Sequence, residues 1–304
     1  FEKTQEISYQ VDEGYYLDLN GDTKKADKLF EKLVNSKYKN QLEAIALGNA
    51  LRNRAEYDYA IKVLDKNQDY MSEPMQHVIA MSQLYYLKGE KETSLDLLLN
   101  YANKGDLPYR QVMANLPVYL NSKEDYTLLK KLLIKRIRSA PFPLLYEEIL
   151  SWAFVQQKDW NSAFVHYKSI SQKKEDQGRT VLNLAEMCMS NKEYDVAIKC
   201  YSYILSLGGG LYYHETQSRL LSARYLSVTS TPYPDSASIA GLEKDFLNYI
   251  AINKNNPFAA LAIPKLADAV NIYHTNPKLY YVGEYLVSVL RCPHNVILTS
   301  IEYV

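Results

Sequence analysis

The chain has only three cysteines, Cys188, Cys200 and Cys292. An odd number of cysteines without metal-ligand spacing provides neither a complete disulfide framework nor a cysteine-based metal site. Cys188 and Cys200 fall at helix positions that face the interior of the predicted fold, where cysteine behaves as a small apolar residue. Cys292 stands beside His294 with no partner motif, which favours packing and capping roles. The few cysteines fit a reducing compartment.

The sequence also lacks an excess of charge of either sign and lacks a long apolar run. Lys plus Arg number 35, and Asp plus Glu number 35. A neutral chain has no overall field to hold nucleic acid or an anionic bilayer, so no nucleic acid is expected and the partners are expected to be proteins or peptides. Charges or prolines interrupt every apolar stretch before the roughly 18–20 residues that a membrane span needs. No transmembrane segment is predicted.

The sequence begins at Phe1 and not at methionine. We expect either a processed chain or a piece of a longer one. The predicted location is the cytoplasm or, if a signal peptide was removed before Phe1, the periplasm or cell envelope.

What the chain does have is length and apolar content, with 304 residues of which 47% are apolar. This composition is typical of a folded protein. The length exceeds that of a usual globular domain and predicts either two domains or one elongated array of repeats.

Small residues recur every 34 residues at two points of the sequence. The first set is Gly14, Gly48 and Ser82, and the second set is Ala26, Ala60 and Ser94. A slip of one residue at Ala140-Pro141 carries the first set on to Ser151 and Ala185 and the second set on to Ala163 and Ala197. An apolar residue follows each member of the second set four positions later, as Phe30 follows Ala26.

This pattern resembles the tetratricopeptide repeat, a 34-residue helix pair with small residues at positions 8 and 20 and an apolar residue at position 24. The small residues have a physical reason, because the two helices of a pair cross closely there. The resemblance implies an all-α, right-handed solenoid of about eight antiparallel helix pairs. An irregular helical bundle is the alternative, but agreement at two fixed positions over five units favours the solenoid.

The 34-residue frame predicts six repeats in residues 1–207, followed by divergent helix pairs in residues 211–304. The approximate repeats are 7–40, 41–74, 75–108, 109–143, 144–177 and 178–210. In the divergent part the predicted elements are a helix at 212–228, a loop at 229–235, a helix at 236–252 and a further pair at 257–273 and 277–291. Residues 293–304 are predicted to begin a helix. Because terminal repeats need a polar cap and this end is apolar, we expect that the chain is truncated there.

The fourth unit departs from the pattern. Leu116 and Leu128 occupy the positions where the other units have small residues. Pro117 stands in the middle of the expected first helix, where a proline removes a backbone hydrogen bond. We expect a kinked helix near Met113.

Motifs with catalytic chemistry are missing. Residues 208–210 are three glycines without the Lys-Ser or Lys-Thr of a phosphate-binding loop, and they predict a turn that ends a helix. His214-Glu215 begins like a zinc-protease helix, but Ser218 stands where the second histidine is required. We therefore predict no enzyme activity, no cofactor and no metal site.

Two features of the composition leave alternatives open. The basic run at residues 128–139 indicates a solvated outer helix face with cations near the helix C-terminus, and the alternative is contact with nucleic acid or anionic lipid. The 28 tyrosines fit the interior of the repeats, and the alternative is a binding surface, where tyrosine is favoured.

The resemblance implies a protein-binding groove lined by the first helix of each pair. The residues at groove positions are Asn49, Arg52, Asn53, Gln83, Tyr86, Arg110, Met113, Asn121, Glu148, Trp152, Gln156, Arg179, Asn183 and Glu186. Chaperone-binding relatives use a lysine, asparagine and arginine clamp, which only Asn49, Asn53 and Arg110 resemble here. Val11 stands in place of the lysine, so binding of a chaperone tail is not predicted.

The function predicted is therefore a non-catalytic scaffold that binds a peptide or a partner protein in the groove. One alternative is a helical module of a larger complex, such as a bacterial envelope export or secretion assembly or an enzyme complex. The other is a sensor of a small ligand or signalling peptide, which a sealed pocket near Pro117 would favour.

Overall fold

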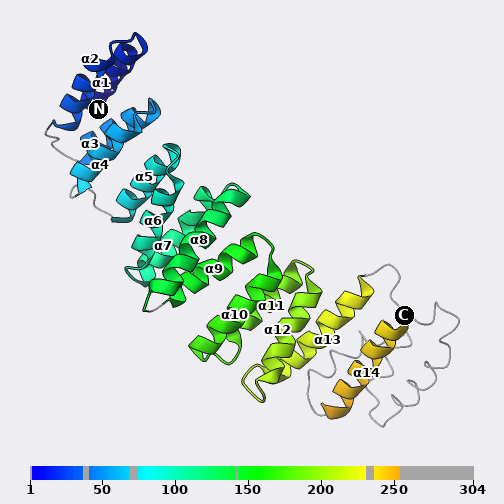
Figure 1. Ribbon diagram of the computed structural model, residues 1–304. Helices are drawn as coiled ribbons and strands as arrows, with labels where there is room; N and C mark the ends of the chain where they lie inside the picture. The colour runs from blue at the N-terminus through cyan, green and yellow to red at the C-terminus, as the bar shows by residue number, and fades with distance from the viewer. Residues whose placement is uncertain (1, 37–40, 69–73, 142, 231–235, 254–304) are drawn as a thin grey trace. The chain divides into compact units, whose positions relative to one another are not determined.

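The computed structural model describes residues 2–36, 41–68, 74–141, 143–230 and 236–253. Within these ranges the backbone forms fourteen α-helices and a short 3₁₀ helix, and no β-strand. Consecutive helices run antiparallel in pairs (Figure 1). The all-α array of tetratricopeptide-like helix pairs is thus confirmed, with seven pairs in the described residues. The right hand of the solenoid stays a prediction.

The chain divides into two compact units, residues 1–150 and 151–304. Unit 1 contains α1 (Glu2–Leu19), α2 (Thr23–Val34), α3 (Gln41–Asn53), α4 (Tyr57–Lys66), α5 (Pro74–Leu87), α6 (Lys91–Ala102), α7 (Asp106–Asn115), the 3₁₀ helix η2 (Leu116–Tyr119) and α8 (Lys123–Ser139). Helix α9 (Leu144–Gln156) contributes to both units. Unit 2 continues with α10 (Trp160–Lys174), α11 (Arg179–Ser190), α12 (Tyr194–Ser206), α13 (Tyr213–Thr229) and α14 (Ser236–Ile252). The predicted repeat and domain boundaries stay predictions.

The second helices of the pairs begin at the predicted spacing. Helices α2, α4 and α6 begin at Thr23, Tyr57 and Lys91, which are 34 residues apart. Helices α10 and α12 begin at Trp160 and Tyr194, again 34 residues apart. Trp160 follows Lys91 by one residue more than two such steps, so the one-residue slip is confirmed.

The turn inside each regular pair has the same backbone conformation. The residues with positive φ in these turns are Gly21 (84°), Ala55 (62°), Gly89 (91°), Lys158 (57°) and Lys192 (63°). The next amide donates to a carbonyl five residues back, as Asp22 N does to Leu17 O at 2.9 Å and Glu90 N to Tyr85 O at 2.9 Å. This is the Schellman ending of a helix, which satisfies its last carbonyls. Three of these turns span residues 20–22, 88–90 and 191–193.

The close crossing expected at the small residues is confirmed. In the third pair, Ser82 of α5 and Ser94 of α6 are both buried and hydrogen-bond reciprocally. Ser82 Oγ donates to Ser94 O at 3.0 Å, and Ser94 Oγ donates to Ser82 O at 2.8 Å. In the first pair, a Cβ on Gly14 would lie 2.5 Å from the ring of Phe30. Larger side chains would push the two helices apart.

The fourth pair is built differently, and the kink predicted near Met113 is wrong. Helix α7 does not bend and continue; it ends at Asn115, and Pro117 lies near the start of the 3₁₀ helix that follows. Proline fits there because the first turn of a helix leaves its N–H groups without intrahelical partners. Leu116, at a position where other pairs have a small residue, is fully buried.

Each unit has its own apolar core. In unit 1 the core joins α1 to α5 around Val11, Phe30, Leu47 and Leu64. In unit 2 it joins α10 to α13 around Leu184, Cys188, Cys200 and Tyr201. The interior location predicted for the two cysteines is confirmed. Helices α13 and α14 confirm the helices predicted at 212–228 and 236–252, whereas the loop at 231–235, the pair at 257–291, Cys292 and residues 293–304 lie outside the described residues.

Candidate functional site

A small pocket of about 120 Å³ lies among α3, α4 and α5 in unit 1. Its lining residues are Ile45, Gly48, Asn49, Arg52, Leu64, Gln76, Ala80 and Leu84. Two of these, Asn49 and Arg52, are predicted groove residues that the fold brings together. The pocket therefore has an apolar floor with a guanidinium and two amide groups beside it.

The arginines at the end of α3 differ in their surroundings. The Arg54 Nε donates to Asp12 Oδ1 at 2.8 Å, and its guanidinium lies 5.0 Å from the centre of the Tyr15 ring. The hydrogen bond to Asp12 raises the pKa of Arg54. Arg52 is half-buried, and within the described residues its guanidinium has no carboxylate partner. Arg54 thus ties α1 to α3.

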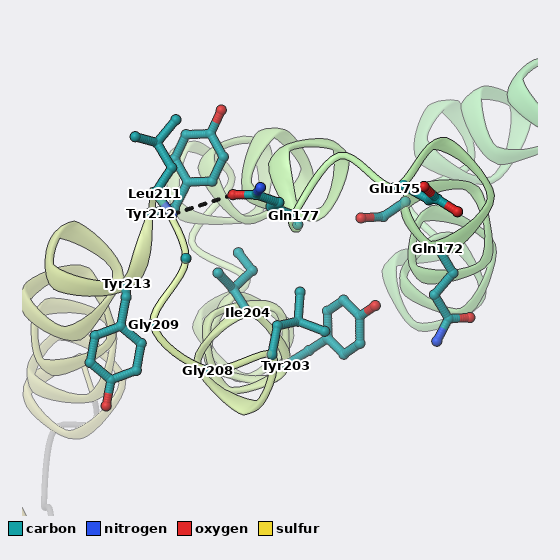
Figure 2. A pocket seen from close by; sticks show the side chains of 14 residues that line it. Gln172, Glu175, Gln177, Tyr203, Ile204, Gly208, Gly209, Leu211, Tyr212 and Tyr213 are labelled. Carbon is teal, nitrogen blue, oxygen red and sulfur yellow. Dashed lines mark hydrogen bonds between the residues drawn. The ribbon is translucent and has the colours of Figure 1, made fainter.

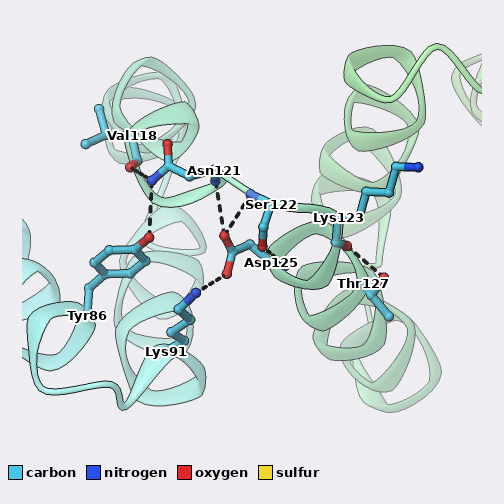
Figure 3. Close-up of polar contacts among 8 residues, drawn as sticks. All are labelled: Tyr86, Lys91, Val118, Asn121, Ser122, Lys123, Asp125 and Thr127. Carbon is cyan, nitrogen blue, oxygen red and sulfur yellow. Dashed lines mark hydrogen bonds and ion pairs between the residues drawn. The ribbon is translucent and has the colours of Figure 1, made fainter.

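Tyr86 and Asn121, also predicted groove residues, meet at the junction of the third and fourth pairs (Figure 3). Asn121 Nδ2 donates to Tyr86 OH at 3.1 Å and to Val118 O at 3.1 Å. Lys91 Nζ lies 5.2 Å from the centre of the Tyr86 ring. Both side chains therefore have polar contacts with neighbours within unit 1.

Asp125 is the charged centre of this junction. Its side chain is only 3% exposed and lies 2.6 Å from Lys91 Nζ. Ser122 and Asp125 also form a capping box at the start of α8, in which Ser122 Oγ accepts from Asp125 N at 3.2 Å. Burial alone raises the pKa of the Asp125 carboxyl, but hydrogen bonds from Lys91, Ser122 and Asn121 lower it below its ordinary value. The carboxylate is a structural link between α6 and α8.

The basic run of α8 is divided between two roles. Lys131, Lys135 and Arg138 are exposed, as a solvated face predicts. Arg136 instead donates to Asp96 Oδ1 at 2.5 Å and to Asn100 Oδ1 at 2.8 Å on α6. One cation of the run therefore holds α8 to α6.

The remaining predicted groove residues of unit 1 lie elsewhere. Arg110 Nη2 pairs with Asp106 at 2.7 Å on the surface of α7, with both side chains mostly exposed. Asn53 is exposed, whereas Gln83, Met113 and Glu148 are half-buried. None of these five lines the pocket between α3 and α5.

In unit 2 the predicted groove residue Glu186 pairs with Arg219, which the sequence pattern did not identify. Arg219 Nη1 lies 2.7 Å from Glu186 Oε1, and Arg219 Nη2 lies 2.6 Å from Glu215 Oε1. Glu215 is the carboxylate that resembled half of a zinc motif, and here it binds a cation on its own helix. Trp152 is half-buried, and Gln156, Arg179 and Asn183 are exposed. Arg219 was missed because α13 lies beyond the regular repeat frame.

A second pocket, of about 760 Å³, lies in unit 2 (Figure 2). It lies where the turn between α10 and α11 meets the turn between α12 and α13. Its lining residues are Ser171, Gln172, Glu175, Gln177, Gly178, Tyr203, Ile204, Leu207, Gly208, Gly209, Gly210, Leu211, Tyr212 and Tyr213. Burial raises the pKa of the Tyr203 hydroxyl, which keeps it neutral. The helix-ending turn predicted at 208–210 is confirmed, but its place in a pocket wall was not predicted.

The described residues contain no group of three or more His, Cys, Asp or Glu side chains that could hold a metal ion. The same part of the chain contains no helix long and apolar enough to cross a membrane. The hydrogen bond between Cys188 and Cys200 and the burial of Cys200 raise the pKa of the Cys200 thiol, so this cysteine is not a thiolate.

No protein-family model matches the chain, and no curated protein matches it. Among solved structures, it is similar to the C-terminal part of a TPR repeat-containing protein from Cytophaga hutchinsonii, with 15% identity and a TM-score of 0.33 over 83% of this chain and 98% of that one. It is also similar to a tetratricopeptide repeat protein from Parabacteroides merdae, with 10% identity and a TM-score of 0.29 over 88% and 100% of the two chains. With scores this low, the helix-pair fold rests on the chain's own spacing and contacts.

Proposed function

We propose that the chain is a non-catalytic protein-interaction scaffold that binds a segment of a partner protein along the first helices of its pairs. The observation that carries this proposal is the pocket between α3 and α5, where Asn49 and Arg52 stand at predicted groove positions above an apolar floor. Helix-pair arrays expose such surfaces because each pair buries its apolar face against its neighbours.

The chemistry of the pocket indicates what it would accept. A volume of about 120 Å³ has room for about four water molecules, which is the size of one small aliphatic side chain. Ile45, Ala80 and Leu84 would contact that side chain. Arg52 would donate to a backbone carbonyl or a carboxylate of the partner, and Asn49 and Gln76 can both donate and accept.

The test uses the full chain and a phage-displayed library of random dodecapeptides as the probe. Selected peptides that slow hydrogen exchange in unit 1 are measured against the double variant Asn49→Ala/Arg52→Ala. A lost hydrogen bond to a charged group costs about 1.5–3 kcal/mol, so binding should weaken by roughly 10- to 100-fold. Bound peptide should also slow hydrogen exchange in α3 and α5.

The matched control is Lys131→Ala/Lys135→Ala, which removes two exposed cations from α8 and should leave binding unchanged. Circular dichroism establishes that both variants fold. Unchanged binding by the Asn49/Arg52 variant, or protection of the outer faces of α2 and α4 in place of α3 and α5, would contradict the proposal. Membership of a larger envelope or enzyme complex stays a prediction.

A further inference from the structure

The large pocket of unit 2 lies between two successive turns of different lengths. The turn between α10 and α11 spans residues 175–178, whereas the turn between α12 and α13 spans residues 207–212. In unit 1 the equivalent turn between α6 and α7 spans only residues 103–105. A pocket of about 760 Å³ lies between the two turns.

The wall formed by residues 175–178 is rigid. The Asp176 carboxylate accepts from Gly178 N at 3.1 Å, from Thr180 N at 2.9 Å and from Ser171 Oγ at 2.5 Å. These bonds hold Glu175 and Gln177 at positive φ, 52° and 56°. Both side chains are exposed at the pocket. Gln177 Oε1 accepts from Leu211 N at 3.5 Å, a long contact that links the two walls (Figure 2).

The opposite wall has few side chains near its middle. A Cβ added at Gly209 would meet no atom within 4 Å, so the glycines leave open space. Apolar side chains stand on either side of them: Leu207 is 48% exposed and Leu211 is 80% exposed. The two leucines add exposed apolar surface at the edge of the pocket.

The lining also limits the charge of a ligand. Glu175 is the only charged residue among the fourteen lining residues. An anionic ligand would therefore face a carboxylate with no lining cation to balance it. The other polar groups are neutral: the amides of Gln172 and Gln177 and the hydroxyl groups of three tyrosines. Tyrosine combines a large apolar ring with a hydrogen-bonding group, and it is enriched where proteins bind peptides.

We propose that this pocket is a second peptide-binding site, which takes an extended polypeptide segment with an aromatic or long aliphatic anchor residue and no acidic side chain next to it. The anchor lies against Tyr203, Tyr212 and Leu211. The amides of Gln172 and Gln177 hydrogen-bond the backbone of the segment. The site lies on the turns of unit 2, so it is separate from the first-helix surface proposed in unit 1.

The test selects a phage-displayed dodecapeptide library on the full native chain and on the variant Gly209→Phe in parallel. Phe fits at this position because Gly209 does not have a positive φ and has open space around its Cβ. Peptides enriched only on the native chain should have an aromatic or aliphatic anchor and lack Asp and Glu. Their affinity should fall at least about tenfold for Gly209→Phe, and they should slow hydrogen exchange at 172–178 and 207–213.

Two further variants keep the result independent of the folding of Gly209→Phe. Gln172→Ala truncates an exposed side chain and should weaken the same peptides about threefold to tenfold, while Lys192→Ala, at the opposite end of α11 and α12, should not. Asn49→Ala/Arg52→Ala should also leave these peptides bound, which separates this site from the one in unit 1. Peptides enriched only on the native chain that are acidic or that protect other helices would overturn the proposal. Failure to enrich any peptide on the native chain over Gly209→Phe would overturn it as well.

Discussion

The third and fourth helix pairs of unit 1 are neighbours in sequence, yet their helices are held together in different ways. In the third pair, Ser82 and Ser94 contact each other and the first helix ends in a Schellman turn. In the fourth, Leu116 stands in place of the small residue, a 3₁₀ helix follows α7, and the capping box of Ser122 and Asp125 starts α8. Small residues are thus needed only where two helices cross closely, and a leucine can replace them where the first helix ends early.

The largest expected effect comes from Leu116→Ala. If the fourth pair crossed as closely as the third, alanine would be the better residue. Because Leu116 is fully buried, we instead expect a cavity and a loss of about 2–5 kcal/mol in the free energy of unfolding, measured by urea denaturation of the full chain. Leu107→Ala, on the preceding helix α7 and 66% exposed, should change stability by less than about 0.5 kcal/mol. Equal effects of the two variants would show that Leu116 has no special packing role.

A second prediction compares two glycines at the same repeat position. In Gly14→Ala the new Cβ would lie 2.5 Å from the Phe30 ring, and we expect a loss of about 1–3 kcal/mol from the displaced ring. In Gly48→Ala the nearest atom, on Leu64, is 3.4 Å away, so alanine should fit and stabilise α3 by about 0.5–1 kcal/mol. Thermal unfolding of both variants tests the opposite signs. Two losses of similar size would mean that the crossing is equally tight in both pairs.

The smallest effect concerns Asp125, whose pKa in the folded chain lies below its ordinary value of 3.8. A carboxyl group whose pKa is lowered in the folded chain stabilises the fold at pH values above its ordinary pKa. This stability is lost as the pH falls through the folded-state pKa. Asp125→Asn should therefore cost about 1 kcal/mol at pH 7, from the weakened cap and the lost ion pair with Lys91. The difference from the native chain in urea midpoint should shrink below pH 4. A difference that is constant from pH 7 to pH 3 would count against the ionised carboxylate.

The sequence was sufficient to predict the helix pairs, the slip at Ala140-Pro141 and the interior position of Cys188 and Cys200. These features follow from short-range rules, namely how closely two helices can cross and where a helix must end. The effect of Pro117 was harder to predict, because a proline can kink a helix or begin a new helical segment. Which of these occurs depends on whether the Leu116 side chain can be buried in the fold.

The polar contacts of the candidate sites were beyond prediction from the sequence. The pair of Glu186 and Arg219 joins a regular repeat to a divergent helix, where the frame no longer places residues. The large pocket lies between the turns at residues 175–178 and 207–212, and no single residue marks it. Ala55, Lys158 and Lys192 adopt positive φ without being glycine, so only their spacing identifies them.

The recurring turn has a consequence for how such a chain can change in length. Glu56 and Glu90 occupy the same place after the turns that end α3 and α5. Excising residues 57–90 would join Glu56 to Lys91 and recreate the same backbone junction. One helix pair could therefore be removed without designing a new loop. The fourth pair does not share that junction, because its second helix starts from the Ser122 cap. A cut or an insertion there would need a designed linker, and the regular pairs are therefore where this protein can most easily gain or lose modules.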